Sequence, residues 1–229
     1  MNSSDASSDI TFTTRTHVMR SVARLSLLTG LCLQTSWLLW VVFGHRARWS
    51  LLLYPIIITA LFAGLAFTNG RLRRLNAIVR IVLGLAFLLS VADRFGLMGA
   101  YGSPGVSFGD YAHFVTYTRQ VNSFLPGSWA PTLAVLATLC ETVIGSALIL
   151  GFSTRNPVCS ALGLLLIFGT AMSISLGFAS QFPYAVVVLA SGAWFLSTLD
   201  CSAWSIEDWR RRSRLSWPSS ERLDKRKGF

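Results

Sequence analysis

Six long apolar stretches restrict the fold of this chain more than any other feature of its sequence. They cover residues 22–43, 50–68, 78–98, 131–152, 157–178 and 182–199. A helix needs about 20 mostly apolar residues to cross the hydrocarbon of a bilayer, and most of the stretches come close to that length. Lipid offers the backbone no hydrogen-bonding partners, so such segments must be helices. The sequence therefore predicts an all-α integral membrane bundle with six transmembrane helices.

Charge supports this interpretation. Only 13% of the residues are charged, against about 25% in an average soluble domain. The net charge of +10 would suggest a nucleic-acid partner in a soluble protein. Here the basic residues lie between or beyond the apolar stretches and no recognition motif accompanies them, so we expect no nucleic acid.

The distribution of basic residues predicts the orientation, because Lys and Arg concentrate in cytoplasmic loops. If the N-terminus is inside, the outer segments hold Arg46, Arg48, Arg94 and Arg119, and the inner segments hold the rest of the 20 basic residues. An even number of crossings returns the C-terminus to the same side. We therefore expect a multi-pass plasma (inner) membrane protein with both ends in the cytoplasm.

Glu141 is the most unusual residue within the apolar stretches. It lies near the middle of 131–152, where an ionised side chain costs about 2.5–3.5 kcal/mol even on insertion scales. It must face the bundle interior and either find a partner or hold a proton. Gly145, on the same face, would let a neighbouring helix approach closely. Two interpretations stay open: a polar contact between helices, or a site of proton or quinone chemistry.

Arg94 is the expected partner of Glu141. It lies roughly 20 Å beyond Arg80 along its helix, and Glu141 lies roughly 15 Å inward along the next stretch. A long arginine stem lets the guanidinium reach inward. Arg80 and Arg155 are alternative partners, and Asp93 either competes for Arg94 or joins a small network. The candidate catalytic residues are therefore Glu141, Arg94 and Asp93.

A second candidate site lies in the long connection over residues 99–130. Apolar residues recur there at helical spacing from Tyr111 onward, which predicts a short amphipathic helix on the outer surface. Tyr111, His113 and Tyr117 could hold a quinone headgroup, and an ordinary packed loop is the alternative. The helix is either a simple cover of the bundle or the cover of a ligand site. Haem and metal sites are not expected, because the sequence lacks suitably spaced ligands.

Three segments carry a resemblance to a known family: RIVLGLAFLLSVADRF (80–95), FLPG (124–127) and ETVIGSALILGFSTR (141–155). From Arg80 to Leu199 the chain resembles the DoxX-like family of small four-helix membrane proteins, which includes the DoxD and MauE groups. That family usually has a Gly before the basic residue that ends its first helix, and here Ala92 and Asp93 stand there. The resemblance implies a four-helix core and an association with redox systems, quinone-linked ones among them.

The chain accordingly divides into four parts. Residues 1–21 are expected to be a flexible cytoplasmic tail, and 22–79 a transmembrane hairpin followed by a basic cytoplasmic loop. Residues 80–199 are the DoxX-like core with its outer amphipathic loop at 99–130. Residues 200–229 are a basic cytoplasmic tail, which either lies on anionic lipid headgroups or is solvated.

Three classes of function remain. The first is a membrane subunit of a quinone-linked redox system, which would not be catalytic alone and would have a redox enzyme or complex subunit as its partner. The second is a non-catalytic scaffold or assembly factor for a partner complex. The third is a small-solute transporter. It is less favoured because the sequence shows no broken helix pair, a feature that transporters often use.

Overall fold

A computed structural model describes residues 3–44 and 49–215 of the chain. These residues form helices and turns with no strand among them, so the all-α prediction is confirmed for them. The α-helices are α1 (Ser3–Phe43), α2 (Trp49–Phe67), α3 (Arg73–Arg94), α4 (Tyr111–Val121), α5 (Ala130–Leu150), α6 (Arg155–Leu176), α7 (Val186–Ser197) and α8 (Ile206–Leu215). Two short 3-10 helices are η1 (Gly127–Trp129) and η2 (Phe178–Gln181). Arg46, Arg48 and the tail from residue 216 onward lie outside the described residues.

Four helical segments are long and apolar enough to cross a membrane: His17–Phe43, Arg73–Arg94, Gly127–Leu150 and Arg155–Leu176. Their length and apolar composition indicate a membrane protein. The other two predicted crossings, 50–68 and 182–199, correspond to the shorter apolar helices Leu52–Phe67 and Val186–Ser197. Four of the six predicted spans thus correspond to helices long and apolar enough to cross a membrane, and α2 covers most of a fifth.

The predicted crossing at 182–199 is shortened at its start. α7 has 12 residues, which make about 18 Å of helix against a hydrocarbon core of about 30 Å. Ala185 has a left-handed φ of 52°, which interrupts a right-handed helix, so the chain enters α7 through η2 and an irregular segment. α7 packs against α1, α2, α3 and α6, and it is apolar on nearly all sides, as a central helix should be.

α1 begins earlier than predicted. The sequence predicts a flexible tail over residues 1–21 and a helix from residue 22, whereas α1 is helical from Ser3. Residues 3–29 include neither Gly nor Pro, and polar residues such as Ser and Thr weaken a helix only slightly. The helix therefore continues through the polar segment before the apolar one.

Polar side chains inside α1 have partners on other parts of the chain. The Arg24 Nε donates to the Ala66 carbonyl at 3.1 Å, which satisfies a carbonyl at the C-terminal end of α2. The Gln34 Nε2 donates to the Phe182 carbonyl at 3.0 Å, in the irregular segment before α7. These two bonds explain how an apolar stretch tolerates its two most polar residues.

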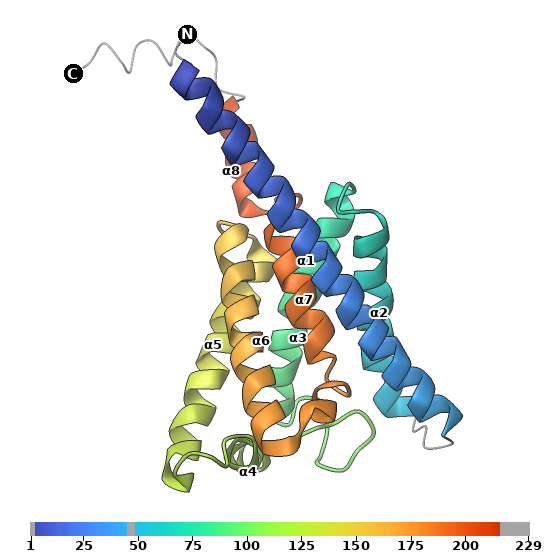
Figure 1. Cartoon of the computed structure of the whole chain (residues 1–229). Coiled ribbons are helices and arrows are strands. Elements are labelled where there is room, and N and C mark those ends of the chain that lie inside the picture. Colours follow the sequence, from blue (N-terminus) through green and yellow to red (C-terminus); the bar gives the residue numbers. More distant parts are fainter. Residues whose placement is uncertain (1–2, 45–48, 216–229) are drawn as a thin grey trace, which may run out of the picture.

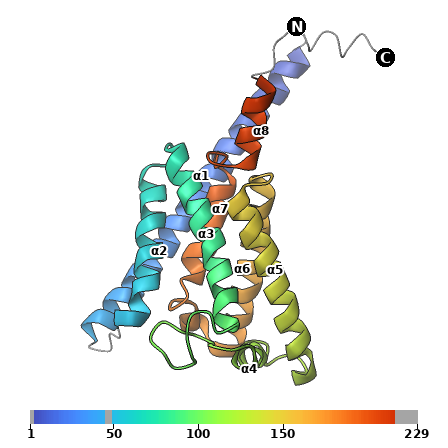
Figure 2. The same ribbon diagram turned by 180° about the vertical axis from the view of Figure 1, so that it is seen from behind.

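The helices run alternately up and down between two distinct ends (Figure 1). One end carries α8, the start of α1 and the turns between α2 and α3 and between α5 and α6; we call it the α8 end. The other end carries α4, which lies across the bundle between α5 and α6, together with the long connection from α3; we call it the α4 end. The reverse view shows α3 and α5 side by side, with α1 and α2 splayed away from them toward the α4 end (Figure 2).

A pair of glycines brings α3 and α5 together. A Cβ atom on Gly84 would lie 2.8 Å from the Gly145 carbonyl oxygen, and one on Gly145 would lie 2.9 Å from the Gly84 carbonyl oxygen. The close approach predicted for Gly145 is confirmed. Because Glu141 lies one turn from Gly145 on the same helix, this crossing sets the distance at which α3 can meet Glu141.

We expect Gly84→Ala to lower the free energy of unfolding by about 1–3 kcal/mol, because the methyl group would force the two backbones apart. Unfolding by SDS in mixed micelles measures the change. Gly163→Ala on α6 is the matched control, since no atom lies within 4 Å of a Cβ there. If Gly84→Ala and Gly163→Ala had the same effect, α3 and α5 would not be in contact at this point.

Candidate functional site

The α4 end contains a buried ion pair between the last residue of α3 and the middle of α5. Arg94 Nη2 lies 2.6 Å from both carboxylate oxygens of Glu141. Each of the two side chains is only 2% exposed. Arg94 also donates to the Thr138 hydroxyl at 2.9 Å and to the Ser90 hydroxyl at 3.1 Å. The predicted pairing of Arg94 with Glu141 is confirmed, and a catalytic role for either residue stays a prediction.

The pair is covered by aromatic rings on α4 and on the connection that precedes it. The Phe114 ring centroid lies 3.6 Å from the Arg94 guanidinium carbon, a cation–π contact. Phe108 lies 6.0 Å from the same carbon and packs edge-on against Phe114. Tyr111 and Tyr117 extend this cluster through Phe114 and Phe108. We call Phe108, Tyr111, Phe114 and Tyr117 the aromatic roof.

Asp93 does not compete for Arg94. Its carboxylate accepts hydrogen bonds from three successive backbone N–H groups, those of Ser107, Phe108 and Gly109, at 2.9–3.1 Å. The side chain is 6% exposed. Three such bonds satisfy an otherwise costly buried carboxylate. Asp93 therefore attaches the connection between α3 and α4 to the end of α3, and through Phe108 it positions the roof above Arg94.

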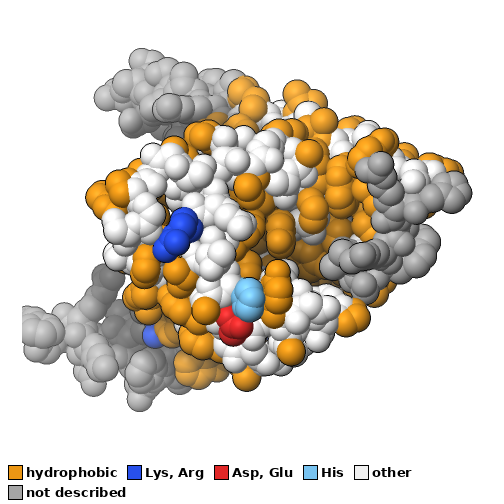
Figure 3. Space-filling view, turned by 90° about the horizontal axis from the view of Figure 1, so that it is seen from below, with side chains coloured by type: hydrophobic (Ala, Val, Ile, Leu, Met, Phe, Trp, Pro, Cys, Tyr) orange, Lys and Arg blue, Asp and Glu red, His pale blue; other side chains and the backbone are white. Residues whose placement is uncertain are grey.

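The three predicted quinone residues lie in two different surroundings. Tyr111 and Tyr117 belong to the aromatic roof, and burial raises the pKa of the Tyr117 hydroxyl, which keeps it protonated. His113 is exposed, stacks on Tyr101 with centroids 3.9 Å apart and places Nδ1 2.7 Å from the Asp110 carboxylate. This end of the molecule shows few charged side chains among hydrophobic and neutral ones (Figure 3).

A second buried arginine, Arg80, lies toward the α8 end. It is fully buried, and its Nη1 donates to the Leu148 carbonyl, which is among the last of α5. Its Nη2 donates to the carbonyls of Ala203 and Trp204 at 3.3 and 3.4 Å. A cation at a helix C-terminus is favoured both by the free carbonyls and by the helix dipole. Arg80 therefore joins α3, the end of α5 and the segment before α8, and it is not a partner of Glu141.

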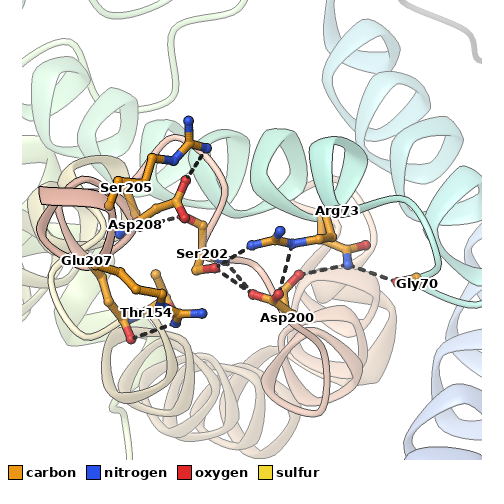
Figure 4. Close-up of polar contacts among 11 residues, drawn as sticks. Gly70, Arg73, Thr154, Asp200, Ser202, Ser205, Glu207 and Asp208 are labelled. Atoms are coloured by element: carbon orange, nitrogen blue, oxygen red, sulfur yellow. Dashed lines mark hydrogen bonds and ion pairs between the residues drawn. The ribbon is translucent and has the colours of Figure 1, made fainter. Parts of the chain in front are cut away.

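Polar contacts around this segment fix α8 to the bundle (Figure 4). The Glu207 carboxylate accepts from the Thr154 backbone N–H at 3.0 Å, just before α6. Asp200 pairs with Arg73 at 2.9 Å, on the surface. Sequence reasoning missed this second centre, although Arg80 lies four residues before Gly84 and so shares the packed face of α3.

We expect a double-mutant cycle to show strong coupling between Arg94 and Glu141. Glu141→Gln leaves a buried guanidinium unpaired and should cost about 3–5 kcal/mol of unfolding free energy, while the double variant with Arg94→Gln should cost much less than the sum of the two single changes. The same cycle at Arg73 and Asp200, whose side chains are 54% and 53% exposed, should give a coupling of at most about 1 kcal/mol. Equal coupling energies at the two sites would contradict the assignment of a dry, buried pair.

We expect Asp93→Ala to expose the connection that it holds. The amides of residues 107–109 would lose a charged acceptor worth about 1.5–3 kcal/mol, so their hydrogen exchange should become about 10- to 100-fold faster. Mass spectrometry of exchanged peptides measures this rate. Asp110→Ala removes the carboxylate that caps α4 and is the control. Unchanged exchange at residues 107–109 in Asp93→Ala would rule out the attachment.

Comparisons with models of protein families, with curated proteins and with solved structures find no match for this chain.

Proposed function

We propose that this chain is a DoxX-like integral membrane subunit of a quinone-linked redox system, and that it works with a redox protein partner. In this proposal it crosses the plasma (inner) membrane six times with both ends in the cytoplasm. In this proposal the chain is not catalytic alone. It binds a quinone headgroup at the aromatic roof, next to Arg94 and Glu141.

One observation carries the quinone part of the proposal. The Arg94 Nε is buried and has no hydrogen-bond partner among the described residues, although the other end of the same guanidinium is bound to Glu141, Thr138 and Ser90. A buried donor without a partner costs free energy, and it is therefore a place where a ligand acceptor would be stabilised. A quinone carbonyl is a neutral acceptor of this kind.

The surroundings of this donor suit a flat aromatic headgroup. The rings of Phe108 and Phe114 lie against the guanidinium, and the Tyr117 hydroxyl, which interacts with Tyr184, is a second polar group within the same roof. Ionisable groups within a membrane are rare and often mark proton or quinone sites, because their cost is retained only for a function. The resemblance of residues 80–199 to the DoxX-like family points to the same class of system.

The charge distribution supports the proposed topology. Among the described residues, the α8 end holds Arg15, Arg20, Arg24, Arg71, Arg73, Arg74, Arg80, Arg155, Arg210, Arg211, Arg212 and Arg214, whereas the α4 end holds Arg94 and Arg119. This excess of arginine is typical of a cytoplasmic face. The short helix α7 completes a sixth crossing only together with η2 and the irregular segment between them, in which Phe182 and Ala185 are buried while Pro183 is exposed.

A scaffold without quinone chemistry is the second candidate. Its support is that the Glu141 carboxylate and the Asp93 carboxylate are both saturated by protein donors. Such a network holds α3, α5 and the connection to α4 together without any ligand. In this case a partner protein would dock on the assembled bundle, and the ion pair would only stabilise it.

We expect the purified protein in nanodiscs to bind a short-chain ubiquinone or menaquinone analogue saturably, as measured by quenching of tryptophan fluorescence. Tyr117→Phe, which removes one donor, should weaken binding by about tenfold, the value of one hydrogen bond in a dry site. Tyr54→Phe on α2 makes the same chemical change away from the site and should leave binding unchanged. Absence of saturable binding, together with co-purification of a stable partner, would favour the scaffold.

We expect cysteine accessibility in intact cells to show the proposed orientation. In a background without the native cysteines, Ser128→Cys at the α4 end should react with a membrane-impermeant maleimide added outside. Arg74→Cys at the α8 end should react only after the membrane is opened, because that face is cytoplasmic. The reverse pattern of labelling would overturn the topology.

A further inference from the structure

A group of basic and aromatic side chains gathers where α5 turns into α6 and where α8 begins. The group consists of Phe152, Arg155, Trp209, Arg210, Arg211 and Arg212, and we call it the α8 patch. The Arg210 guanidinium carbon lies 5.6 Å from the Phe152 ring centroid, which joins α8 to the end of α5. The ion pair and the quinone site at the α4 end use none of these residues.

Hydrogen bonds of Glu207 and Ser205 hold the patch in place. Glu207 accepts hydrogen bonds from the Thr154 backbone N–H and hydroxyl at 3.0 and 3.2 Å. The Ser205 hydroxyl accepts from the Asp208 N–H at 3.0 Å and so caps the start of α8. These contacts, drawn in part in Figure 4, fix α8 against the start of α6. Its arginines are therefore displayed in a defined position.

The front of the patch is exposed and carries a net positive charge. Trp209 is 68% exposed, and the Arg211 and Arg212 side chains are 58% and 77% exposed. Four arginines in the patch face two neighbouring carboxylates: Glu207, which lies 4.0 Å from Arg211, and Asp208, which lies 2.7 Å from Arg212. Within the described residues, Arg155 and Arg210 have no carboxylate partner.

The depth of the patch identifies its partner. The patch lies at the turn over residues 151–154, which joins the end of the apolar span Gly127–Leu150 to the start of the span Arg155–Leu176. The hydrocarbon therefore gives way to headgroups at this level. Tryptophan prefers this depth because its ring is apolar and its N–H requires a polar partner. Arginine binds phosphate with two parallel hydrogen bonds, and basic residues near a membrane contribute about 1 kcal/mol each toward anionic lipid.

We propose that the α8 patch binds the phosphate of anionic phospholipid headgroups, with the arginines on the phosphate and with Trp209 and Phe152 at the boundary of the acyl chains. The proposal rests on the membrane placement given under Proposed function but not on the quinone site. Bound lipid at this point would hold α8 close to the bilayer surface. A soluble acidic protein is the competing occupant, and the experiment below separates the two.

The test uses the full chain in bilayers of phosphatidylcholine and phosphatidylglycerol at about three to one, probed with spin-labelled forms of each lipid by electron paramagnetic resonance. The wild type should prefer phosphatidylglycerol over phosphatidylcholine in its first lipid shell, and the preference should fall in 1 M salt. Arg210→Gln should lower the preference by up to about fivefold, the equivalent of one basic contact near the surface. Arg119→Gln removes the same charge at the α4 end and should have no effect.

Three results would overturn the proposal. The first is that the wild type shows no preference for phosphatidylglycerol. The second is that Arg119→Gln reduces the preference as much as Arg210→Gln does. The third is that an acidic protein co-purifies with the wild type and is lost in Arg210→Gln, while the lipid preference is unchanged. Quinone binding, followed in the same samples by fluorescence, reports separately on the α4 end. Loss of one property with retention of the other thus shows which of the two proposals fails.

Discussion

Charged side chains buried inside this bundle must find their partners within the protein, because an unpaired buried charge is costly. Arg94 and Glu141 meet this requirement by pairing with each other. Arg80 meets it with carbonyl oxygens at the end of α5 and before α8. Removing one partner of such a contact leaves a buried charge, so each contact specifies how its helices assemble. The close approach of Gly84 and Gly145 lies between the two centres on α3 and α5 and keeps the helices near enough for both.

The two centres give the molecule two different ends. At the α4 end, Asp93 holds the connection that places aromatic rings over the ion pair, which leaves a buried arginine donor in an apolar, ring-lined environment. At the α8 end, Arg80 and Glu207 fix a basic helix where the spans end. The first arrangement suits a small flat ligand with acceptor atoms, and the second suits the charged surface of a bilayer. α3 and α5 connect the two, since each helix contributes to both centres.

The ion pair could be predicted from the sequence because one physical rule governs it: a carboxylate in the middle of an apolar helix needs a cation at reachable depth. The contacts of Asp93 could not, since its partners are backbone N–H groups in a connection without a recognisable pattern. The carbonyl partners of Arg80 could not be predicted either, because carbonyl acceptors are present in every sequence and no residue type marks them. α7 is shorter than its apolar stretch because the left-handed backbone at Ala185 interrupts the helix. Hydropathy alone does not contain that information.

A distance measurement between Arg94 and Glu141 in a bilayer tests the central claim most directly. Solid-state nuclear magnetic resonance on protein labelled with ¹⁵N at arginine side chains and ¹³C at glutamate carboxyl carbons detects guanidinium–carboxylate contacts. The account predicts strong dipolar dephasing of one glutamate signal, because the Arg94 nitrogen and the Glu141 oxygens are 2.6 Å apart, and it predicts loss of that signal in Glu141→Gln. Glu207 lies 4.0 Å from Arg211 and should give only weaker dephasing, which Glu141→Gln leaves unchanged. The absence of a strongly dephased signal from the wild type, or its survival in Glu141→Gln, would contradict the account.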